Sequence, residues 1–245
     1  MGTSADPTWR QWHGHALIVG GGGIGRALLE QLQQQSPHLQ LHLATRAPIP
    51  GDACRLDLVD DASLQDLKQL AESQWQPLRL VINTAGVLHG PGLQPEKRLA
   101  AVERRALEAS FAINAFGPLL LAQAVAGALS RDLPCHFSSL SARVGSIGDN
   151  QLGGWYAYRG AKAAQNQLLR TLAIEWRRRL PQCCVSLLHP GTTATALSQP
   201  FRGSVQADRL FTPARAANQL LQVLAGLTAA DSGGFWAWDG QPIPW

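Results

Sequence analysis

The stretch Leu17-Ile18-Val19-Gly20-Gly21-Gly22-Gly23-Ile24-Gly25-Arg26-Ala27 decides the fold, because it leads from an apolar strand pattern into a helical one through four consecutive glycines. Gly20, Gly22 and Gly25 match the spacing GxGxxG. Glycine at these places allows a tight turn, close approach of the backbone to a pyrophosphate, and close packing of the helix on the strand. The helix N-terminus then offers unpaired N–H groups and partial positive charge to phosphates. Since the motif directly follows the first strand pattern, it predicts a dinucleotide-binding turn rather than a flexible surface loop. The candidate phosphate-binding residues are Gly20, Gly22, Gly23, Ile24 and Gly25.

Short apolar runs alternate with helical segments through the rest of the chain. The runs expected to be strands are 16–19, 39–43, 54–58, 78–82, 135–140, 184–188 and 235–238. The segments expected to be helical are 24–32, 64–70, 99–129, 156–180 and 213 to about 227. Strands that alternate with helices indicate a parallel sheet with helices on both faces. The sequence therefore predicts an α/β fold, a single-domain Rossmann-type doubly wound parallel sheet over residues 15–245, after a polar tail over residues 1–14.

Composition narrows the kind of protein. Of the 245 residues, 45% are hydrophobic and 16% charged, so an ordered domain is expected. No run approaches the roughly 18 apolar residues of a membrane-spanning helix, and the N-terminus lacks the apolar core of a secretory signal. The four cysteines have no metal-ligand spacing and are expected to be reduced, which favours a cytoplasmic location and predicts no metal site. The formal charge of +4 raises the question of nucleic acid, but no basic stripe interleaved with aromatic residues supports that partner, and none is expected.

The end of the second expected strand bears on which dinucleotide binds. An NAD-binding fold usually carries an acidic residue there for the ribose 2′-hydroxyl, yet no Asp or Glu occurs between Glu30 and Asp52. Arg46 stands at this place instead, and its guanidinium matches the geometry of a 2′-phosphate, to which Thr45 could add a hydroxyl contact. NADP is therefore predicted in preference to NAD, the alternative being that Arg46 is a solvated loop residue. Asp57, with Leu58 beside it, is a candidate for the adenine edge, or equally a turn cap.

Tyr158 and Lys162 are four residues apart in a helical segment, which places both side chains on one face. A phenol with a pKa near 10 is a poor acid or base at neutral pH. An ammonium beside it favours the phenolate and lowers that pKa, so the pair could exchange a proton with an alcohol or carbonyl oxygen. Taken alone, the same spacing would describe an exposed pair on an amphipathic helix.

Six motifs in order resemble those of the short-chain dehydrogenase/reductase family, and the resemblance covers nearly the whole chain. They are Gly20–Gly25, Asn83-Thr84-Ala85-Gly86, Asn114, the serines of Ser138–Ser146, Tyr158 with Lys162, and Pro190–Thr195. The stretch from Gly145-Ser146-Ile147 through Gly153–Arg159 is similar, more narrowly, to the sniffer-like carbonyl reductases and the bacterial C-factor group. One departure is a glycine turn one residue shorter than the family's usual spacing.

The resemblance implies roles for individual residues. Tyr158 would be the general acid of carbonyl reduction, Lys162 would lower its pKa and bind the nicotinamide ribose, and Asn114 would help to hold a water beside Lys162. The family serine would polarise the substrate oxygen; Ser141 matches it best, with Ser139 as the alternative, because residues two apart on a strand share a face. Further cofactor contacts would come from Asn83, Ala85, Gly86, Pro190, Gly191, Thr193 and Thr195.

Together these observations predict an NADP-dependent oxidoreductase acting on a small carbonyl or alcohol compound. The resemblance also implies a homodimer or homotetramer. The alternative is a dinucleotide-binding sensor or signalling protein of the same fold with little turnover.

Overall fold

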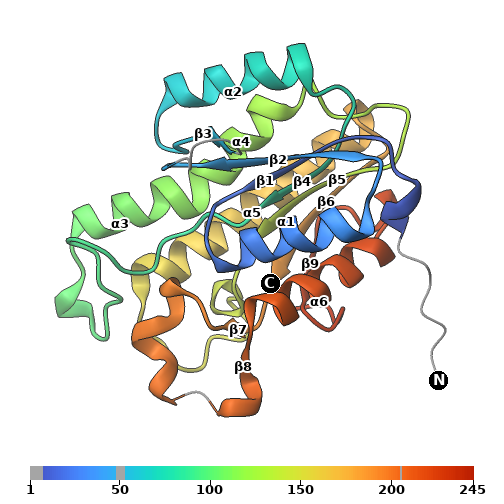
Figure 1. Cartoon of the computed structure of the whole chain (residues 1–245). Helices are drawn as coiled ribbons and strands as arrows, with labels where there is room; N and C mark the ends of the chain where they lie inside the picture. The colour runs from blue at the N-terminus through green and yellow to red at the C-terminus, as the bar shows by residue number, and fades with distance from the viewer. Residues whose placement is uncertain (1–7, 48–52, 205) are drawn as a thin grey trace.

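The computed structural model of the chain describes residues 8–47, 53–204 and 206–245, and its centre is a parallel sheet (Figure 1). The seven strands run in the order β3-β2-β1-β4-β5-β6-β9, and every neighbouring pair is parallel. Their bounds are Gly14–Val19 (β1), Leu39–Thr45 (β2), Ala53–Arg55 (β3), Leu78–Asn83 (β4), Cys135–Leu140 (β5), Cys183–His189 (β6) and Gly234–Ala237 (β9). The strand order changes direction between β1 and β4. In open parallel sheets a ligand crevice forms at the carboxyl ends of the strands at such a point.

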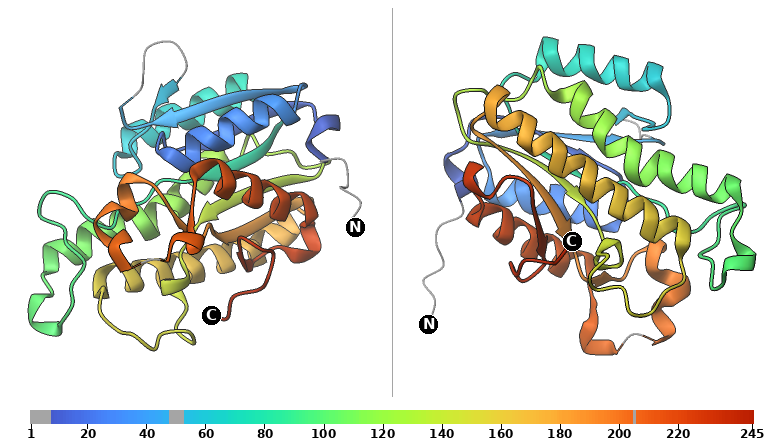
Figure 2. Two further views of the ribbon diagram at one scale, coloured as in Figure 1. Left: turned by 60° about the horizontal axis from the view of Figure 1, so that its bottom comes forward. Right: turned by 180° about the vertical axis from the view of Figure 1, so that it is seen from behind.

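Two layers of helices cover the two faces of the sheet (Figure 2). Helices α1 (Gly23–Gln35) and α6 (Pro213–Gly226) pack on one face, and α2 (Asp61–Gln74), α4 (Gly117–Val125) and α5 (Tyr156–Arg179) pack on the other. Alternate residues of β1 supply the two cores: Leu17 and Val19 join the core under α5, while Ala16 and Ile18 join the core under α1. Both faces of β1 are therefore buried against apolar cores, which explains its continuous apolar run in the sequence. The predicted α/β fold is confirmed.

The long helical segment expected over residues 99–129 is interrupted in the structure. It consists of a short 3₁₀ turn (Leu99–Ala101), α3 (Arg104–Phe111), a π-helical turn (Ala112–Phe116) and α4. Pro118, in the first turn of α4, lacks the N–H that a continuous ladder needs. The π-helical turn carries Asn114 and buries it completely. Such turns occur frequently at functional sites.

The polar tail expected over residues 1–14 is shorter than predicted. Residues Thr8–Gln11 form a 3₁₀ helix, and β1 already begins at Gly14. Trp9 is 1% exposed and Trp12 is 6% exposed, with their ring centroids 5.1 Å apart. The large apolar area of the two indoles outweighs the polarity of the residues around them, so the segment packs against the sheet. Residues 1–7 lie outside the described part of the chain.

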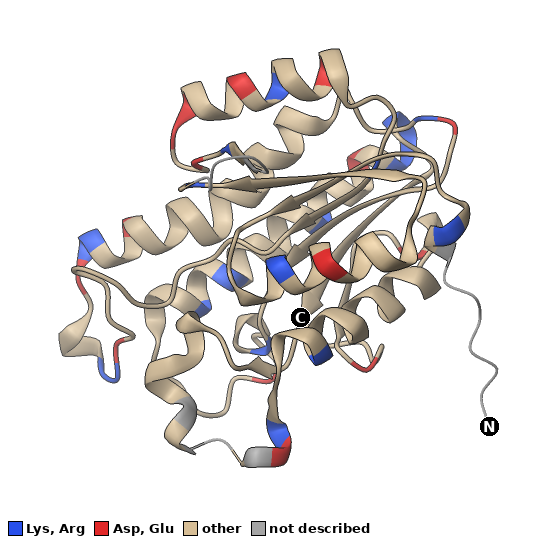
Figure 3. Cartoon of the chain, viewed as in Figure 1, with Lys and Arg blue, Asp and Glu red and all other residues tan. Residues whose placement is uncertain are grey.

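Shorter elements complete the fold. A two-stranded ribbon pairs β7 (Thr192–Thr193) with β8 (Leu210–Phe211), and 3₁₀ turns span Arg143–Gly145, Ala196–Ser204, Ala207–Arg209 and Ala229–Asp231. All four cysteines are free. Within residues 8–47, 53–204 and 206–245, no group of three or more His, Cys, Asp or Glu could hold a metal ion, and no helix could cross a membrane. Lys, Arg, Asp and Glu are scattered over several helices and loops (Figure 3).

Candidate active site

The glycine-rich turn has the tight geometry that its sequence predicts. Gly20 has φ +106°, its N–H donates to the Ala44 carbonyl at 2.8 Å, and a Cβ on it would lie 2.5 Å from Thr84 Oγ1. A Cβ on Gly25 would collide with the Gly20 carbonyl oxygen, so only glycine lets α1 approach the turn this closely. Gly22 is the N-cap of α1, and no atom lies within 4 Å of the place of its Cβ. The turn thus leaves an open cradle at a helix N-terminus, which fits a phosphate group.

The residues at the end of β2 lie beside this cradle. A Cβ on Gly21 would lie 2.8 Å from Thr45 Cγ2, so Thr45 adjoins the turn. Thr45 is 9% exposed, and its buried Oγ1 has no hydrogen-bond partner among the described residues. The next residue, Arg46, is exposed. An unpaired buried hydroxyl is unusual, and together with the open cradle it fits a polar ligand such as a dinucleotide.

Asp57 and Leu58 have other partners than the predicted adenine. The Asp57 carboxylate accepts from the Val59 N–H at 3.2 Å, and the Asp57 N–H donates to Ser63 Oγ at 2.9 Å. This is the turn-cap arrangement that was the alternative for Asp57. Leu58 is 6% exposed and belongs to the core that α4 covers. Contact of either residue with a cofactor stays a prediction.

The segment after β4 connects three strands through its polar side chains. Asn83, which is fully buried, donates to Ser139 Oγ at 3.0 Å and accepts from the Ala85 N–H at 3.1 Å. Thr84 Oγ1 donates to the Val19 carbonyl at 2.9 Å, which joins this segment to β1. A Cβ on Gly86 would lie 3.1 Å from Asn114 Oδ1 and 3.9 Å from Lys162 Nζ. The predicted residues Asn83 and Gly86 therefore connect this segment to β5 and place it next to Asn114 and Lys162.

The carboxamide of Asn114 is hydrogen-bonded to the backbone of Val87. Its Oδ1 accepts from the Val87 N–H at 3.0 Å, and its Nδ2 donates to the Val87 carbonyl at 2.8 Å and to Ser110 Oγ at 3.1 Å. These bonds hold the segment after β4 against the π-helical turn. The predicted contact of Asn114 with a water beside Lys162 stays a prediction.

Tyr158 and Lys162 lie one turn apart on α5, and both are buried, at 9% and 3% exposed. The exposed amphipathic pair that the spacing alone would allow is therefore ruled out. Lys162 Nζ lies 5.8 Å from the centroid of the Tyr158 ring and donates to the Leu140 carbonyl at 2.8 Å and to Gln165 Oε1 at 2.9 Å. Burial disfavours both charged forms, so it lowers the pKa of Lys162 to about 7 and raises the pKa of Tyr158 above its ordinary value.

This direction for Tyr158 is the reverse of the one expected from the sequence. The ammonium of Lys162 is hydrogen-bonded to two neutral oxygens, and desolvation outweighs its attraction for a phenolate. The phenol is accordingly protonated at neutral pH, which is the form that a proton donor requires.

The serines near the end of β5 have different partners, and only one of them lines a cavity with Tyr158. Ser141 lines it and donates to Asn166 Oδ1 at 2.6 Å. Ser139 is completely buried and accepts from Asn83 and from Gln165 Nε2. Of the two candidates, Ser141 is thus the one that faces the cavity, whereas Ser139 belongs to the interior of the sheet.

This cavity has a volume of about 510 Å³ and extends between the glycine-rich turn and the reacting side chains. Its lining includes Ile24 beside the turn, Ser141 and Tyr158, the predicted segment Pro190–Thr195 apart from Ala194, and an aromatic wall. The wall is formed by Trp155 and Phe201, whose ring centroids lie 5.0 Å apart. Side chains from five separate segments therefore meet here, at the carboxyl ends of β5 and β6.

The segment after β6 makes a turn beside this cavity that requires glycine. Gly191 has φ +73°, and a Cβ on it would lie 2.5 Å from the Phe211 ring. Thr193 Oγ1 donates to the Pro190 carbonyl at 3.4 Å, and Ser198 Oγ donates to the Thr193 carbonyl at 2.5 Å. A Cβ on Gly23 would lie 3.2 Å from Thr195 Cγ2, so Thr195 reaches the glycine-rich turn. This contact brings the segment after β6 next to the start of α1.

Two residues that contact the site, Gln165 and Asn166, were not predicted from the sequence. Gln165 and Asn166 follow Tyr158 by seven and eight positions on the same helix, a spacing that returns to one face and could have identified them. Trp155, which belongs to the stretch Gly153–Arg159 that carries the narrower resemblance, is the N-cap of α5, and Phe201 lies in the 3₁₀ turn Ala196–Ser204.

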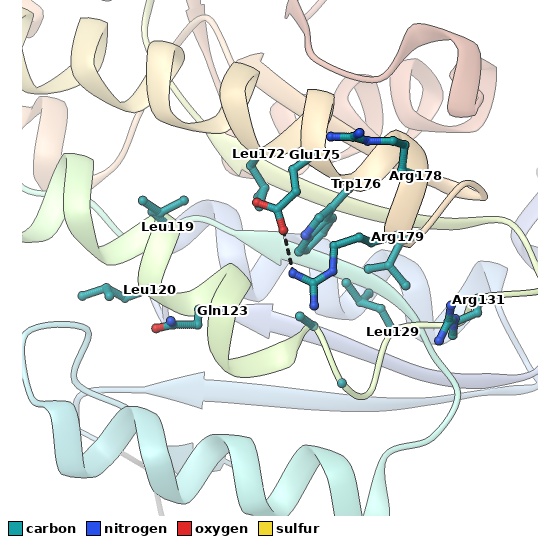
Figure 4. A pocket seen from close by; sticks show the side chains of 13 residues that line it. Leu119, Leu120, Gln123, Leu129, Arg131, Leu172, Glu175, Trp176, Arg178 and Arg179 are labelled. Carbon is teal, nitrogen blue, oxygen red and sulfur yellow. Dashed lines mark hydrogen bonds and ion pairs between the residues drawn. The ribbon is translucent and has the colours of Figure 1, made fainter.

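A larger cavity, of about 830 Å³, lies between α4 and the C-terminal half of α5 (Figure 4). Its side chains include Leu119, Gln123 and Trp176, with an exposed ion pair between Glu175 and Arg179 at 2.8 Å. None of the predicted site residues lines it. The volume of a cavity alone therefore does not identify the active site. The smaller cavity is the candidate active site, because several of the predicted site residues line it.

Comparison with known proteins adds three findings. The pattern of the short chain dehydrogenase family matches residues 14–205. The C-signal protein of Myxococcus xanthus is 32% identical over 170 residues, which make up 69% of this chain and 93% of that protein. Two solved structures have the same fold: an NADPH-bound carbonyl reductase from chicken fatty liver (TM-score 0.81, 24% identity, 95% of this chain and 99% of that one) and the carbonyl reductase Sniffer of D. melanogaster (TM-score 0.79, 23% identity, 96% and 100%).

Proposed function

The chain belongs to the short-chain dehydrogenase family of oxidoreductases, and from this membership we propose that it transfers a hydride between NADP and a carbonyl or alcohol substrate, with Tyr158 exchanging the proton. One observation carries the proposal: Tyr158 and Ser141 line the same cavity as Ile24 of the glycine-rich turn. A substrate oxygen near the two hydroxyls would thus be within reach of a nicotinamide whose phosphates bind at that turn.

In the direction of reduction, a bound NADPH supplies a hydride to the carbonyl carbon. Ser141 donates a hydrogen bond to the carbonyl oxygen and polarises it, after exchanging its bond to Asn166. Tyr158 transfers its phenolic proton to the same oxygen, which completes the alcohol and leaves a phenolate. Lys162, held close to the ring, stabilises that phenolate until a proton from solvent restores the phenol. In oxidation the same residues act in reverse.

Several residues would hold the dinucleotide. The glycine-rich turn would bind the pyrophosphate through backbone N–H groups, and Lys162 would bind the nicotinamide ribose. Asn83, Ala85 and Gly86 would line the adenosine side, and Pro190, Gly191, Thr193 and Thr195 would hold the carboxamide. At the 2′-position, the exposed guanidinium of Arg46 and the unpaired hydroxyl of Thr45 support the phosphate of NADP.

The walls of the cavity indicate the kind of substrate. Leu88, Leu152, Trp155, Leu197 and Phe201 are apolar, and Leu152 is 92% exposed, so it lies at the surface in this structure. The lining also includes charged and polar side chains, among them Arg143, Asp149 and Arg159, while Ser141 and Tyr158 supply the two hydroxyls that would orient a substrate oxygen. A carbonyl compound with an apolar or aromatic body would bury that body against Trp155 and Phe201 and direct its oxygen toward the two hydroxyls.

The experiment that tests this function is oxidation of NADPH and of NADH by the purified protein, followed at 340 nm. The substrates are a panel of aldehydes, ketones, quinones and 3-oxoacyl thioesters. We expect turnover that depends on a carbonyl substrate and that is faster with NADPH. Binding of the dinucleotide without turnover across the panel would favour the alternative, a sensor or signalling protein of this fold.

Three further features of the protein belong to the same proposal. We expect a homodimer or homotetramer, measurable by sedimentation equilibrium, and a cytoplasmic location, measurable by cell fractionation. We also expect no retention on DNA, even at low salt, where electrostatic binding would be strongest.

A further inference from the structure

Gln165 is a buried polar residue for which the mechanism above has no use. It follows Lys162 by three positions on α5 and has no exposed surface. Its Oε1 accepts a hydrogen bond from Lys162 Nζ at 2.9 Å. Its Nε2 donates to Ser139 Oγ at 2.8 Å and to the Leu140 carbonyl at 3.3 Å. A buried amide with both ends paired is fixed in place, because leaving either end unpaired would cost the desolvation of that group.

The partners of Gln165 determine which way its amide points. An ammonium has only donors and a carbonyl oxygen has only acceptors. The oxygen of Gln165 must therefore be directed at Lys162, and its NH₂ at Leu140. The reverse orientation would place two donors together and two acceptors together in a site that has no exposed surface. The orientation thus follows from chemistry and not from the assignment of the two amide atoms.

Ser139 extends this contact into a chain of hydrogen bonds across the sheet. Its Oγ also accepts from Asn83 Nδ2 at 3.0 Å, and Asn83 Oδ1 accepts from the Ala85 N–H at 3.1 Å. Asn83, Ser139 and Gln165 all have no exposed surface. The chain joins the ends of β4 and β5 to α5, and it ends at Lys162. Gln165 is consequently anchored to two strands and cannot follow Lys162 if the lysine side chain moves.

The surroundings of Lys162 are otherwise neutral. Tyr158 lies on its own helix, and the Leu140 carbonyl faces it from β5. The backbone of Gly86 comes from the segment after β4, with Asn114 of the π-helical turn beside it, and Gly145 packs against its Cβ. No carboxylate contacts Lys162 among the described residues, and burial is the only resolved cause of its lowered pKa. Two oxygens, from Leu140 and Gln165, therefore supply the described hydrogen bonds to its nitrogen.

We propose that Gln165 is a positioning residue that holds Lys162 Nζ beside Tyr158 and stabilises its ammonium form through a neutral acceptor. A hydrogen bond to a charged form favours that form, so the bond from Gln165 opposes the effect of burial. Because the acceptor is uncharged, it leaves the positive charge of Lys162 available to a phenolate. A carboxylate at the same place would form an ion pair and cancel that charge. The inference depends on the proposed function only in treating Lys162 as part of the reacting site.

The test is the pKa of Lys162 in the ligand-free protein, measured by NMR from the ¹³Cε signal that disappears in Lys162→Arg. Gln165→Met keeps the length of the side chain and removes the acceptor, and Gln165→Glu replaces the acceptor with a charged one. Gln167→Met is the matched control, because Gln167 is an exposed glutamine on the same helix. We expect Gln165→Met to lower the pKa of Lys162 by about 1 to 2 units, the size of one charge-assisted hydrogen bond. Gln165→Glu should raise it, and Gln167→Met should leave it unchanged.

The proposal would be overturned if the Lys162 signal gave the same pKa, within a few tenths of a unit, in wild type, Gln165→Met and Gln165→Glu. It would also be overturned if the pKa shifted in the same direction in both variants. If Gln165→Met does not fold, Gln165→Asn takes its place, since the shorter amide cannot reach Lys162 and should also lower the pKa. An unchanged pKa in that variant would likewise overturn the proposal.

Activity gives a second measurement. The alkaline limb of kcat/KM for carbonyl reduction should move to lower pH in Gln165→Met and to higher pH in Gln165→Glu, which a merely structural role would not produce. The titration needs no cofactor and no substrate. A wild-type protein that reduces no carbonyl compound would therefore refute the proposed function, while the NMR result would still decide the role of Gln165.

Discussion

The two ends of the central sheet both bury ionisable groups, with different consequences. At the carboxyl end, burial shifts the pKa of Lys162 and of Tyr158, and a cavity of about 510 Å³ reaches Tyr158. At the amino end, burial, with the nearby positive charge of Arg79, lowers the pKa of His136 to about 4. There the imidazole is stacked on Trp12, with ring centroids 5.6 Å apart, and is 4% exposed.

The comparison teaches that a shifted pKa indicates a reacting group only where a ligand can approach it. The physical cause, desolvation, is the same at both ends. At the carboxyl end, hydrogen bonds fix the polar groups around an open cavity. At the amino end, Trp9 and Trp12 pack over His136, and the guanidinium of Arg79 lies 4.2 Å from the Trp12 ring. Burial makes stability depend on pH at both ends, but only the carboxyl end combines shifted groups with a cavity through which a ligand can approach them.

The largest effect should come from Tyr158→Phe, which removes the proton donor and keeps the ring. We expect kcat for NADPH-dependent carbonyl reduction to fall by about 10²- to 10⁴-fold, the usual contribution of general acid catalysis. The melting temperature should change little, because the ring still packs against Trp155. Full activity in this variant would contradict the mechanism and would remove the contrast between the two ends.

The amino end should respond to acid. The pKa of His136 lies below its ordinary value in the folded protein, so the unfolded chain binds more protons between pH 6.5 and about 4. The stability that depends on His136 being neutral is therefore fully present above pH 6.5 and is lost as the pH falls to about 4. It amounts to about 3 kcal/mol of the free energy of unfolding.

Urea denaturation at pH 7 and at pH 4.5 measures this loss. His136→Phe, which preserves a ring between Trp9 and Trp12, should lose less stability over this interval than wild type. His38→Gln is the control, since His38 is exposed and only stacks on His13. Equal losses in His136→Phe and wild type would show that the amino end is not the acid-sensitive part of the fold.

Ser141 and Ser139 allow the comparison to be repeated within the carboxyl end. Ser141→Ala should lower kcat by about 10²-fold, as loss of one hydrogen-bond donor to a developing oxyanion does. Because it leaves the buried Asn166 Oδ1 without that donor, it should also cost about 1 kcal/mol of stability. Ser139→Ala leaves the NH₂ groups of Asn83 and Gln165 without their buried acceptor, so it should cost about 1 to 3 kcal/mol of stability. Steady-state kinetics and urea denaturation of both variants distinguish the two roles. A large loss of kcat in Ser139→Ala, with kcat retained in Ser141→Ala, would make Ser139 the catalytic serine.

The smallest effect concerns the exposed residue Arg46. Arg46→Ala should raise the KM for NADPH by about tenfold, since solvent weakens a charge pair at the surface, and should leave the KM for NADH unchanged. Arg177→Ala, at the exposed C-terminal end of α5, is the matched control. An equal change for both dinucleotides would refute the assignment of Arg46 to the 2′-phosphate.

The local features of this protein could be predicted from the sequence because they depend on neighbouring residues. The strand–glycine–helix order around Gly20–Gly25 determines the phosphate turn, and the spacing of Tyr158 and Lys162 determines that they share a helix face. Alternating apolar runs and helical patterns were sufficient for the parallel sheet. Family membership also followed from the order of short motifs along the chain.

Only the tertiary structure decided which polar groups are buried, which are hydrogen-bonded and which a ligand can reach. Trp9 and Trp12 belong to the core although their segment is polar, because the packed partner, not the local composition, determines burial. The helical pattern over residues 99–129 could not show the π-helical turn at Asn114, and the serine cluster could not separate Ser141 from Ser139. The direction of the pKa shift of Tyr158 was likewise decided by desolvation, which depends on every chain segment around the ring and therefore exists only in the assembled fold.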